Sequence, residues 1–85
     1  MALFIIERNF ADAIEIDPDN RDVREVNDEL GVKWLYSFLS ADKKKTYCLY
    51  EATSAEAIHE AARRCGIPAD VITEVNPAKG PALLV

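Results

Sequence analysis

Apolar residues along this chain follow two kinds of pattern. Nearly unbroken apolar or aromatic runs occur at residues 3–6, 34–39 and 47–50. Such runs are typical of strands that are covered on both faces of a sheet. Elsewhere apolar residues recur every three or four positions, at Val23, Val26 and Leu30 and again at Ala57, Ile58, Ala61, Ala62 and Cys65. This spacing places them along one face of a helix.

Local signals give the ends of these elements. Asp17-Pro18 indicates a helix start, because aspartate can accept free amide hydrogens and proline suits the first helical position, and Gly31 ends that helix. A capping-box sequence, Thr53-Ser54-Ala55-Glu56, starts the second helix, which ends at Gly66. The remaining segments predict strands over residues 2–10, 32–40, 46–52 and 70–75, with a hairpin turn at residues 41–45.

The order of these elements predicts an α+β domain of the ferredoxin-like βαββαβ type. Its sheet would be four-stranded and antiparallel, with two helices on one face and the first and third strands in the centre. We expect one domain over residues 1–76 and a C-terminal tail over residues 77–85, whose apolar end would dock on the sheet or on a partner.

Two helices cover only one face of such a sheet. Because the strands are apolar on both faces, the second face needs another cover. We therefore expect a homodimer that pairs through this sheet face, as in a dimeric αβ barrel.

Charge and composition exclude several classes of protein. The net charge is −5, and residues 43–45 form the only basic cluster, so we expect neither nucleic acid nor an anionic membrane as a partner. No apolar run reaches the roughly 18–20 residues of a membrane span, and nothing near the N-terminus resembles a signal peptide. Two cysteines without metal-binding spacing predict reduced thiols, which fits a cytoplasmic protein.

Candidate ligand-binding residues lie on the strands. Trp34, Tyr36 and Phe38 alternate, so the three rings are predicted to share one sheet face, as interface packing or as the floor of a ligand site. The hydroxyls of Tyr36 and Tyr50 would need partners if they are buried. This gives one predicted ligand-binding set, which consists of Glu7, Trp34, Tyr36, Tyr50 and Glu74.

Charged residues on the two strands predicted to be adjacent leave two interpretations open. Arg8 and Glu74 could form a cross-strand ion pair, or a carboxylate in an apolar cavity could bind a cation or move a proton. His59 is predicted to face water from the second helix. The sequence contains no motif of a known catalytic site, and we assign no catalytic residue.

Four blocks of the sequence resemble a family of small bacterial ferredoxin-like proteins of undefined function, some of which bind nickel. The blocks are residues 6–10, 30–38, 45–52 and 72–75. The resemblance implies a divalent metal such as nickel, but Tyr36 stands where the family usually has histidine. Because a neutral phenol is a poorer nickel ligand than imidazole, we expect Glu7 and Cys48 as the metal ligands, with Tyr50 and Glu74 as further candidates.

Together these observations favour a small dimeric binding protein for a divalent metal or a small organic ligand. One alternative is a cofactor-free enzyme of the dimeric αβ-barrel type, a monooxygenase or an isomerase, with Glu7 as base beside Tyr36. A purely structural module is the other alternative.

Overall fold

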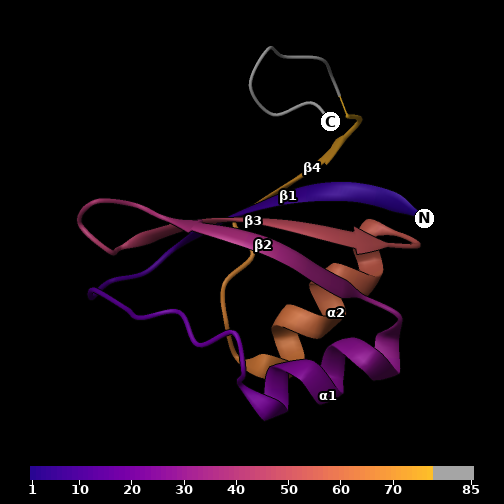
Figure 1. The fold of residues 1–85 in the computed structure, drawn as a ribbon, viewed down its shortest axis with the longest axis horizontal. Coiled ribbons are helices and arrows are strands. Elements are labelled where there is room, and N and C mark those ends of the chain that lie inside the picture. The colour runs from indigo at the N-terminus through magenta and orange to yellow at the C-terminus, as the bar shows by residue number, and fades with distance from the viewer. Residues whose placement is uncertain (78–85) are drawn as a thin grey trace.

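One antiparallel sheet and two helices make up the fold (Figure 1). The computed structural model describes residues 1–77. Its elements are β1 (Ala2–Asn9), α1 (Arg21–Leu30), β2 (Lys33–Leu39), β3 (Lys45–Ala52), α2 (Ala55–Cys65) and β4 (Val71–Val75). This confirms the predicted ferredoxin-like βαββαβ order. The predicted tail lies outside the described residues, except for Pro77.

The strands lie in the order β2-β3-β1-β4, so β1 and β3 are central, as predicted. Even-numbered residues of β1 and β3 point toward the helices and odd-numbered residues point away from them, because side chains alternate along a strand. The core on the helix side contains Phe4, Ile6, Cys48 and Tyr50, with Ile58 of α2 packed against them.

Each helix begins later than the sequence predicted. The N-cap of α1 is Asn20, whose Oδ1 accepts a hydrogen bond from the amide of Val23 at 3.2 Å. Asp17, the predicted cap, instead accepts from the amide of Asp19 at 2.9 Å, so residues 17–19 form a turn before the helix. Asparagine and aspartate cap about equally well, and their relative strength could not decide between them. The cap of α2 is Ser54 rather than Thr53.

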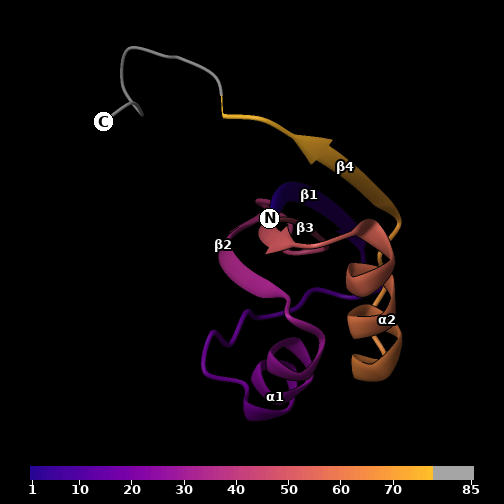
Figure 2. The same cartoon turned by 90° about the vertical axis from the view of Figure 1, so that its right-hand side faces the viewer.

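Both helices lie on the same side of the sheet, and Figures 1 and 2 show no helix on the other side. We call this uncovered side the open face. Within residues 1–77, no helix is long and apolar enough to cross a membrane.

An irregularity in β2 separates aromatic residues that the alternation had placed together. Trp34 pairs with Tyr50, and the next paired residue, Tyr36, is opposite Leu49, so Leu35 is an extra residue of the β-bulge kind. The prediction of a shared face is therefore wrong for Trp34, which points toward the helices. Tyr36 and Phe38 are on the open face, and their rings contact edge to face at a centroid distance of 5.0 Å.

The irregular segment between β1 and α1 is fixed to the β2–β3 turn. The amides of Phe10 and Ile14 donate to the carbonyls of Lys44 and Lys43, each at 2.8 Å. Lys43 has the left-handed φ of 63°, unusual for a residue with a side chain, and its carbonyl receives the Ile14 amide in this conformation. These bonds hold residues 10–20 over the helix side of the sheet.

Candidate functional site

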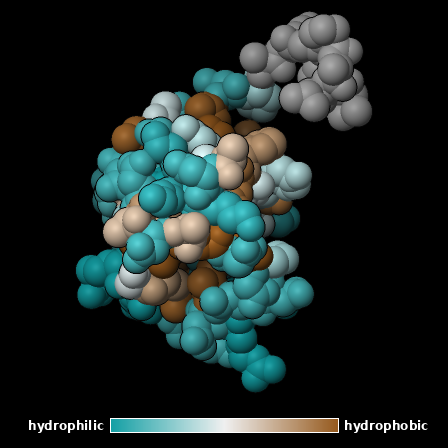
Figure 3. All heavy atoms as spheres, turned by 90° about the vertical axis from the view of Figure 1, so that its left-hand side faces the viewer, coloured by the Kyte–Doolittle hydropathy of each residue, from teal (hydrophilic) through white to brown (hydrophobic). Residues whose placement is uncertain are grey.

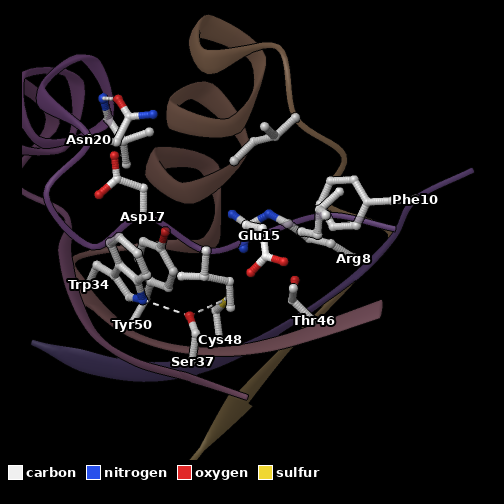
Figure 4. A pocket seen from close by; sticks show the side chains of 14 residues that line it. Arg8, Phe10, Glu15, Asp17, Asn20, Trp34, Ser37, Thr46, Cys48 and Tyr50 are labelled. Carbon is white, nitrogen blue, oxygen red and sulfur yellow. Dashed lines mark hydrogen bonds between the residues drawn. The ribbon is translucent and has the colours of Figure 1, made fainter. Parts of the chain in front are cut away.

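A pocket opens on the helix side of the sheet, beneath residues 10–20 (Figure 4). Its volume is about 280 Å³, slightly below the roughly 300 Å³ at which pockets for drug-sized ligands begin. Apolar side chains form much of its wall, namely Phe10, Ile14, Ile16, Val23, Trp34 and Ile67. We call it the Arg8 pocket, after the charged group at its centre.

Arg8 is a buried charge without an anionic partner. The residue is 4% exposed, yet it takes part in none of the ion pairs formed by residues 1–77. Its guanidinium carbon lies 5.5 Å from the centre of the Tyr50 ring, a cation–π arrangement that offsets only part of the cost of burying the charge. In Figure 4 the guanidinium lies in the middle of the pocket, with Phe10 on one side and Trp34 and Tyr50 on the other.

Thr46 adds a second polar group to the same wall. It is 3% exposed and lies directly opposite Arg8 in the register of β1 and β3. Among the described residues, Arg8 Nε and Thr46 Oγ1 are the two buried side-chain polar atoms that lack a hydrogen-bond partner. Buried polar groups in folded proteins are nearly always paired, so these two adjacent exceptions make this wall the candidate site.

The other polar groups of the pocket wall are already engaged. Trp34 Nε1 donates to Ser37 Oγ at 2.7 Å, and Ser37 Oγ lies 2.9 Å from Cys48 Sγ, to which it donates in turn. Burial raises the pKa of the Tyr50 phenol above its ordinary value, so the hydroxyl stays protonated at neutral pH. Arg8 is therefore the charged group of the pocket interior.

Two acidic residues lie at the rim. The Glu15 carboxylate pairs with Lys43 Nζ at 3.0 Å and is largely in solvent, while Asp17 is held by the turn described above.

Figure 3 shows the molecule from the side of the β2–β3 turn, where hydrophobic atoms reach the surface between hydrophilic regions above and below.

The open face is a second candidate surface. Its strand residues are mostly apolar, and they include Leu3, Ile5, Tyr36, Phe38, Tyr47, Leu49, Val71 and Val75. Tyr36 and Phe38 are 60% and 63% exposed. Glu7 lies among these residues, and its carboxylate is 3.1 Å from Lys45 Nζ.

The structure divides the predicted ligand-binding set. Trp34 and Tyr50 line the Arg8 pocket, whereas Glu7 and Tyr36 are on the open face. Glu7 and Tyr36 belong to strands on either side of β3, roughly 10 Å apart, so they are not in contact as a base and a hydroxyl would have to be.

The expected Arg8–Glu74 ion pair is absent from the described residues. Glu74 pairs with Phe4, four residues from Arg8 along β1, which is roughly 13 Å away. The two strands are antiparallel neighbours as predicted, but their register separates the charges. Glu74 lies exposed on the outer strand and belongs to neither candidate surface.

The two expected metal ligands also lie apart. Cys48 pairs with Ile6 and points toward the helices, while Glu7 points to the open face. Residues 1–77 bring together no group of three or more His, Cys, Asp or Glu side chains that could hold a metal ion. The donors within residues 1–77 of one chain therefore do not form a nickel site.

Sequence reasoning missed Arg8 and Thr46 as site residues. A signal for Arg8 was present, because it follows Phe4 and Ile6 at period two and so continues the buried face of β1. A charged residue in phase with buried ones is either paired or functional. Thr46 carried no such signal in the sequence.

Fold and pocket together define a small ferredoxin-like protein with a largely apolar pocket around a buried arginine on the helix side of its sheet. A family model described as nickel responsive protein SCO4226-like matches residues 4–75, and the chain belongs to this family. The resemblance seen in the four sequence blocks is thereby confirmed.

A solved structure agrees with this assignment. The crystal structure of SCO4226 from Streptomyces coelicolor A3(2) is similar to this chain with a TM-score of 0.78 and 26% sequence identity. The match covers 92% of this chain and 100% of the other. No curated protein sequence matches this chain closely enough to count as a relative.

Proposed function

We propose that this protein binds a small organic molecule in the Arg8 pocket and that it acts as a homodimer. One observation supports the proposed ligand. The largely apolar cavity has two adjacent buried polar atoms in its wall, Arg8 Nε and Thr46 Oγ1, and neither has a hydrogen-bond partner among the described residues. An unpaired buried polar group costs about 1–3 kcal/mol. A ligand whose polar group pairs with the guanidinium and the hydroxyl, after a small shift of these side chains, recovers this cost while its apolar part fills the cavity.

The family description suggests nickel as a second candidate ligand. The donors within one chain argue against it, because Glu7 and Cys48 are on opposite sheet faces and Tyr36 replaces the expected imidazole. A nickel site in this protein would have to draw its donors from two copies. The organic ligand requires no such addition, and we favour it for that reason.

The proposed partner at the open face is a second copy of the chain. The whole chain carries a charge of −5, so two copies repel each other in general. On the strands of the open face, however, Lys33 and Lys45 balance Glu7 and Glu51. Lys33 lies opposite Glu51, and Lys45 pairs with Glu7. The apolar face can therefore meet an identical face without bringing unbalanced charges together.

The single tryptophan allows a direct test of the ligand. Trp34 is the one tryptophan and lines the Arg8 pocket, so its indole N–H resonance in ¹⁵N-labelled protein reports on this cavity. We would titrate the protein with a panel of small aromatic and branched acids, amides and alcohols, and separately with Ni²⁺. Organic compounds should shift this resonance and raise the melting temperature, because a ligand of the native state stabilises it.

Two results would contradict the proposal. One is a panel that leaves the Trp34 resonance unchanged at millimolar concentration. The other is stabilisation by stoichiometric Ni²⁺ alone, which would favour a metal site built from two copies.

A further inference from the structure

We infer that the ligand of the Arg8 pocket is an organic monoanion, a small carboxylic acid whose carboxylate is bound by the Arg8 guanidinium and whose apolar body contacts Trp34 and Phe10. This inference rests on the proposed function and specifies the chemical class of the ligand.

The positive charge of Arg8 lies inside the fold. Arg8 continues the buried face of β1 after Phe4 and Ile6, so its side chain begins inside the core rather than at the surface. A buried arginine in a folded protein is normally paired with a carboxylate or with several acceptors. Among residues 1–77, Arg8 has no ion-pair partner, and its enclosed Nε has no hydrogen-bond partner.

A carboxylate is the acceptor that fits the Arg8 guanidinium. Guanidinium presents its N–H groups in a planar fork, and a carboxylate accepts two of them in parallel. The adjacent Thr46 hydroxyl can donate to the same carboxylate, because it faces Arg8 across the strand pair. Arg8 and Thr46 thus supply two kinds of donor on one wall of the pocket.

The remaining wall of the pocket suits an apolar ligand body. The Trp34 indole N–H is committed to Ser37, so Trp34 offers the ligand its ring rather than a polar group. With Phe10 and Ile14 it forms an apolar wall around about 280 Å³ of space. This volume suits a compact body such as a phenyl ring or a branched alkyl chain.

The rim limits the charge of the ligand to a single carboxylate. Glu15 and Asp17 lie at the mouth, so a second negative group that reached past the cavity would meet two carboxylates. Lys43 neutralises only Glu15. A dicarboxylate or a phosphate monoester with two negative charges should therefore bind more weakly than a monocarboxylate of the same body.

The experiment compares compounds of one shape and different charge. Benzoate, benzamide, phenyl phosphate and inorganic phosphate are titrated into the full chain, with the Trp34 indole resonance and intrinsic fluorescence as readouts. We expect benzoate to bind at least about tenfold more tightly than benzamide, because hydrogen bonds between two charged groups are about twice as strong as those with a neutral partner. Phenyl phosphate should bind more weakly than benzoate, and inorganic phosphate should not shift Trp34.

Variants assign the effect to Arg8. Arg8→Met keeps a long apolar side chain and should abolish the preference for benzoate over benzamide while circular dichroism shows an intact fold. Arg8→Lys keeps the positive charge and should keep part of the preference for benzoate. It therefore still tests the role of the charge if Arg8→Met fails to fold. Arg24→Met removes the same charge from the exposed surface of α1 and should leave the preference unchanged.

Each contrary outcome has its own meaning. Equal binding of benzoate and benzamide, or a preference that survives Arg8→Met, overturns the carboxylate assignment and leaves the pocket as a site for neutral ligands. Tighter binding of either phosphate overturns it in favour of a phosphate site. If no organic compound perturbs Trp34, both this inference and the proposed function fail.

Discussion

Trp34 and Tyr36 are two positions apart in one strand, yet their side chains lie on opposite faces of the sheet. The register shift at Leu35 causes this, since Trp34 pairs with Tyr50 and Tyr36 with Leu49. Trp34 therefore lines the Arg8 pocket, and Tyr36 belongs to the open face. One extra residue in β2 thus assigns an aromatic ring to each of the two candidate surfaces.

Deletion of single residues in β2 tests this relationship. Removing Leu35 leaves Trp34 and Tyr36 as successive residues with their present partners, so both rings should stay on their faces. We expect the unfolding free energy to fall by less than about 2 kcal/mol, the range of an ordinary mutation. Removing Ser37 instead moves the residues on one side of it to the wrong face and should unfold the chain at 25 °C. Urea unfolding measures the stability of each deletion variant, and the Trp34 resonance shows whether the ring keeps its surroundings. An equal loss of stability from the two deletions would contradict the bulge at Leu35.

The sequence predicted the order of elements because that order depends on long runs and helical spacing, which single residues do not alter. The face of Trp34 could not be predicted, because a bulge changes the parity of a strand without changing its composition. The prediction of an Arg8–Glu74 ion pair was wrong for a similar reason. Strand order was readable, but the register of β1 against β4 is set by contacts along the whole strand pair.

Part of the site was visible in the sequence and was given a different meaning. Trp34 and Tyr50 were predicted to bind ligand, and both line the Arg8 pocket. Trp34 was grouped with Tyr36 because regular alternation was assumed throughout β2, whereas Tyr50 was included for its hydroxyl. The pocket itself also depends on residues 10–20, whose path is fixed by backbone bonds to the turn at Lys43 and Lys44. No side-chain pattern records such bonds.

Thr46→Val should stabilise the protein without ligand. Valine has nearly the shape of threonine, and the change removes a buried hydroxyl that lacks a partner. We expect the unfolding free energy to rise by about 1 kcal/mol, as measured by urea denaturation. Thr53→Val, at an exposed position, is the control and should change it by less than about 0.5 kcal/mol. A loss of stability in the Thr46 variant would mean that the hydroxyl is paired in the free protein.

Glu15→Gln tests whether the rim carboxylate competes for Arg8. If Glu15 pairs only with Lys43, the change should leave stability within about 0.5 kcal/mol, because exposed ion pairs contribute little. It should also tighten benzoate binding by about two- to fivefold, since one negative charge leaves the mouth and Lys43 becomes free. Calorimetric titration at low and high salt measures this, and the gain should shrink with salt. A drop in stability beyond about 2 kcal/mol would identify Glu15 as the partner of Arg8.

Phe38→Glu tests the proposed homodimer. Phe38 is 63% exposed on the open face, so a carboxylate there costs a monomer little but places two charges inside an interface between copies. Sedimentation velocity at micromolar concentration should show a dimer for the natural chain and a monomer for the variant. His59→Glu adds a carboxylate on the exposed side of α2 and should remain dimeric. A natural chain that sediments as a monomer would refute the assembly and leave the Arg8 pocket unaffected.

Glu60 gives the expected acid dependence of stability. Hydrogen bonds from Arg63 and Arg64 lower the pKa of its carboxyl from 4.5 to about 2. Because the folded state holds this group ionised below its unfolded pKa, the ion pairs stabilise the fold above about pH 4.5, and this contribution is lost as the pH falls toward 2. The melting temperature of Glu60→Gln should therefore lie below that of the natural chain at pH 7, and the gap should close between pH 4.5 and 2. Glu25→Gln removes a carboxylate that forms no ion pair with the described residues and should give a smaller gap at pH 7. A gap for Glu60→Gln that persists at pH 2 would show that packing of the Glu60 side chain, rather than its ion pairs with Arg63 and Arg64, contributes the stability.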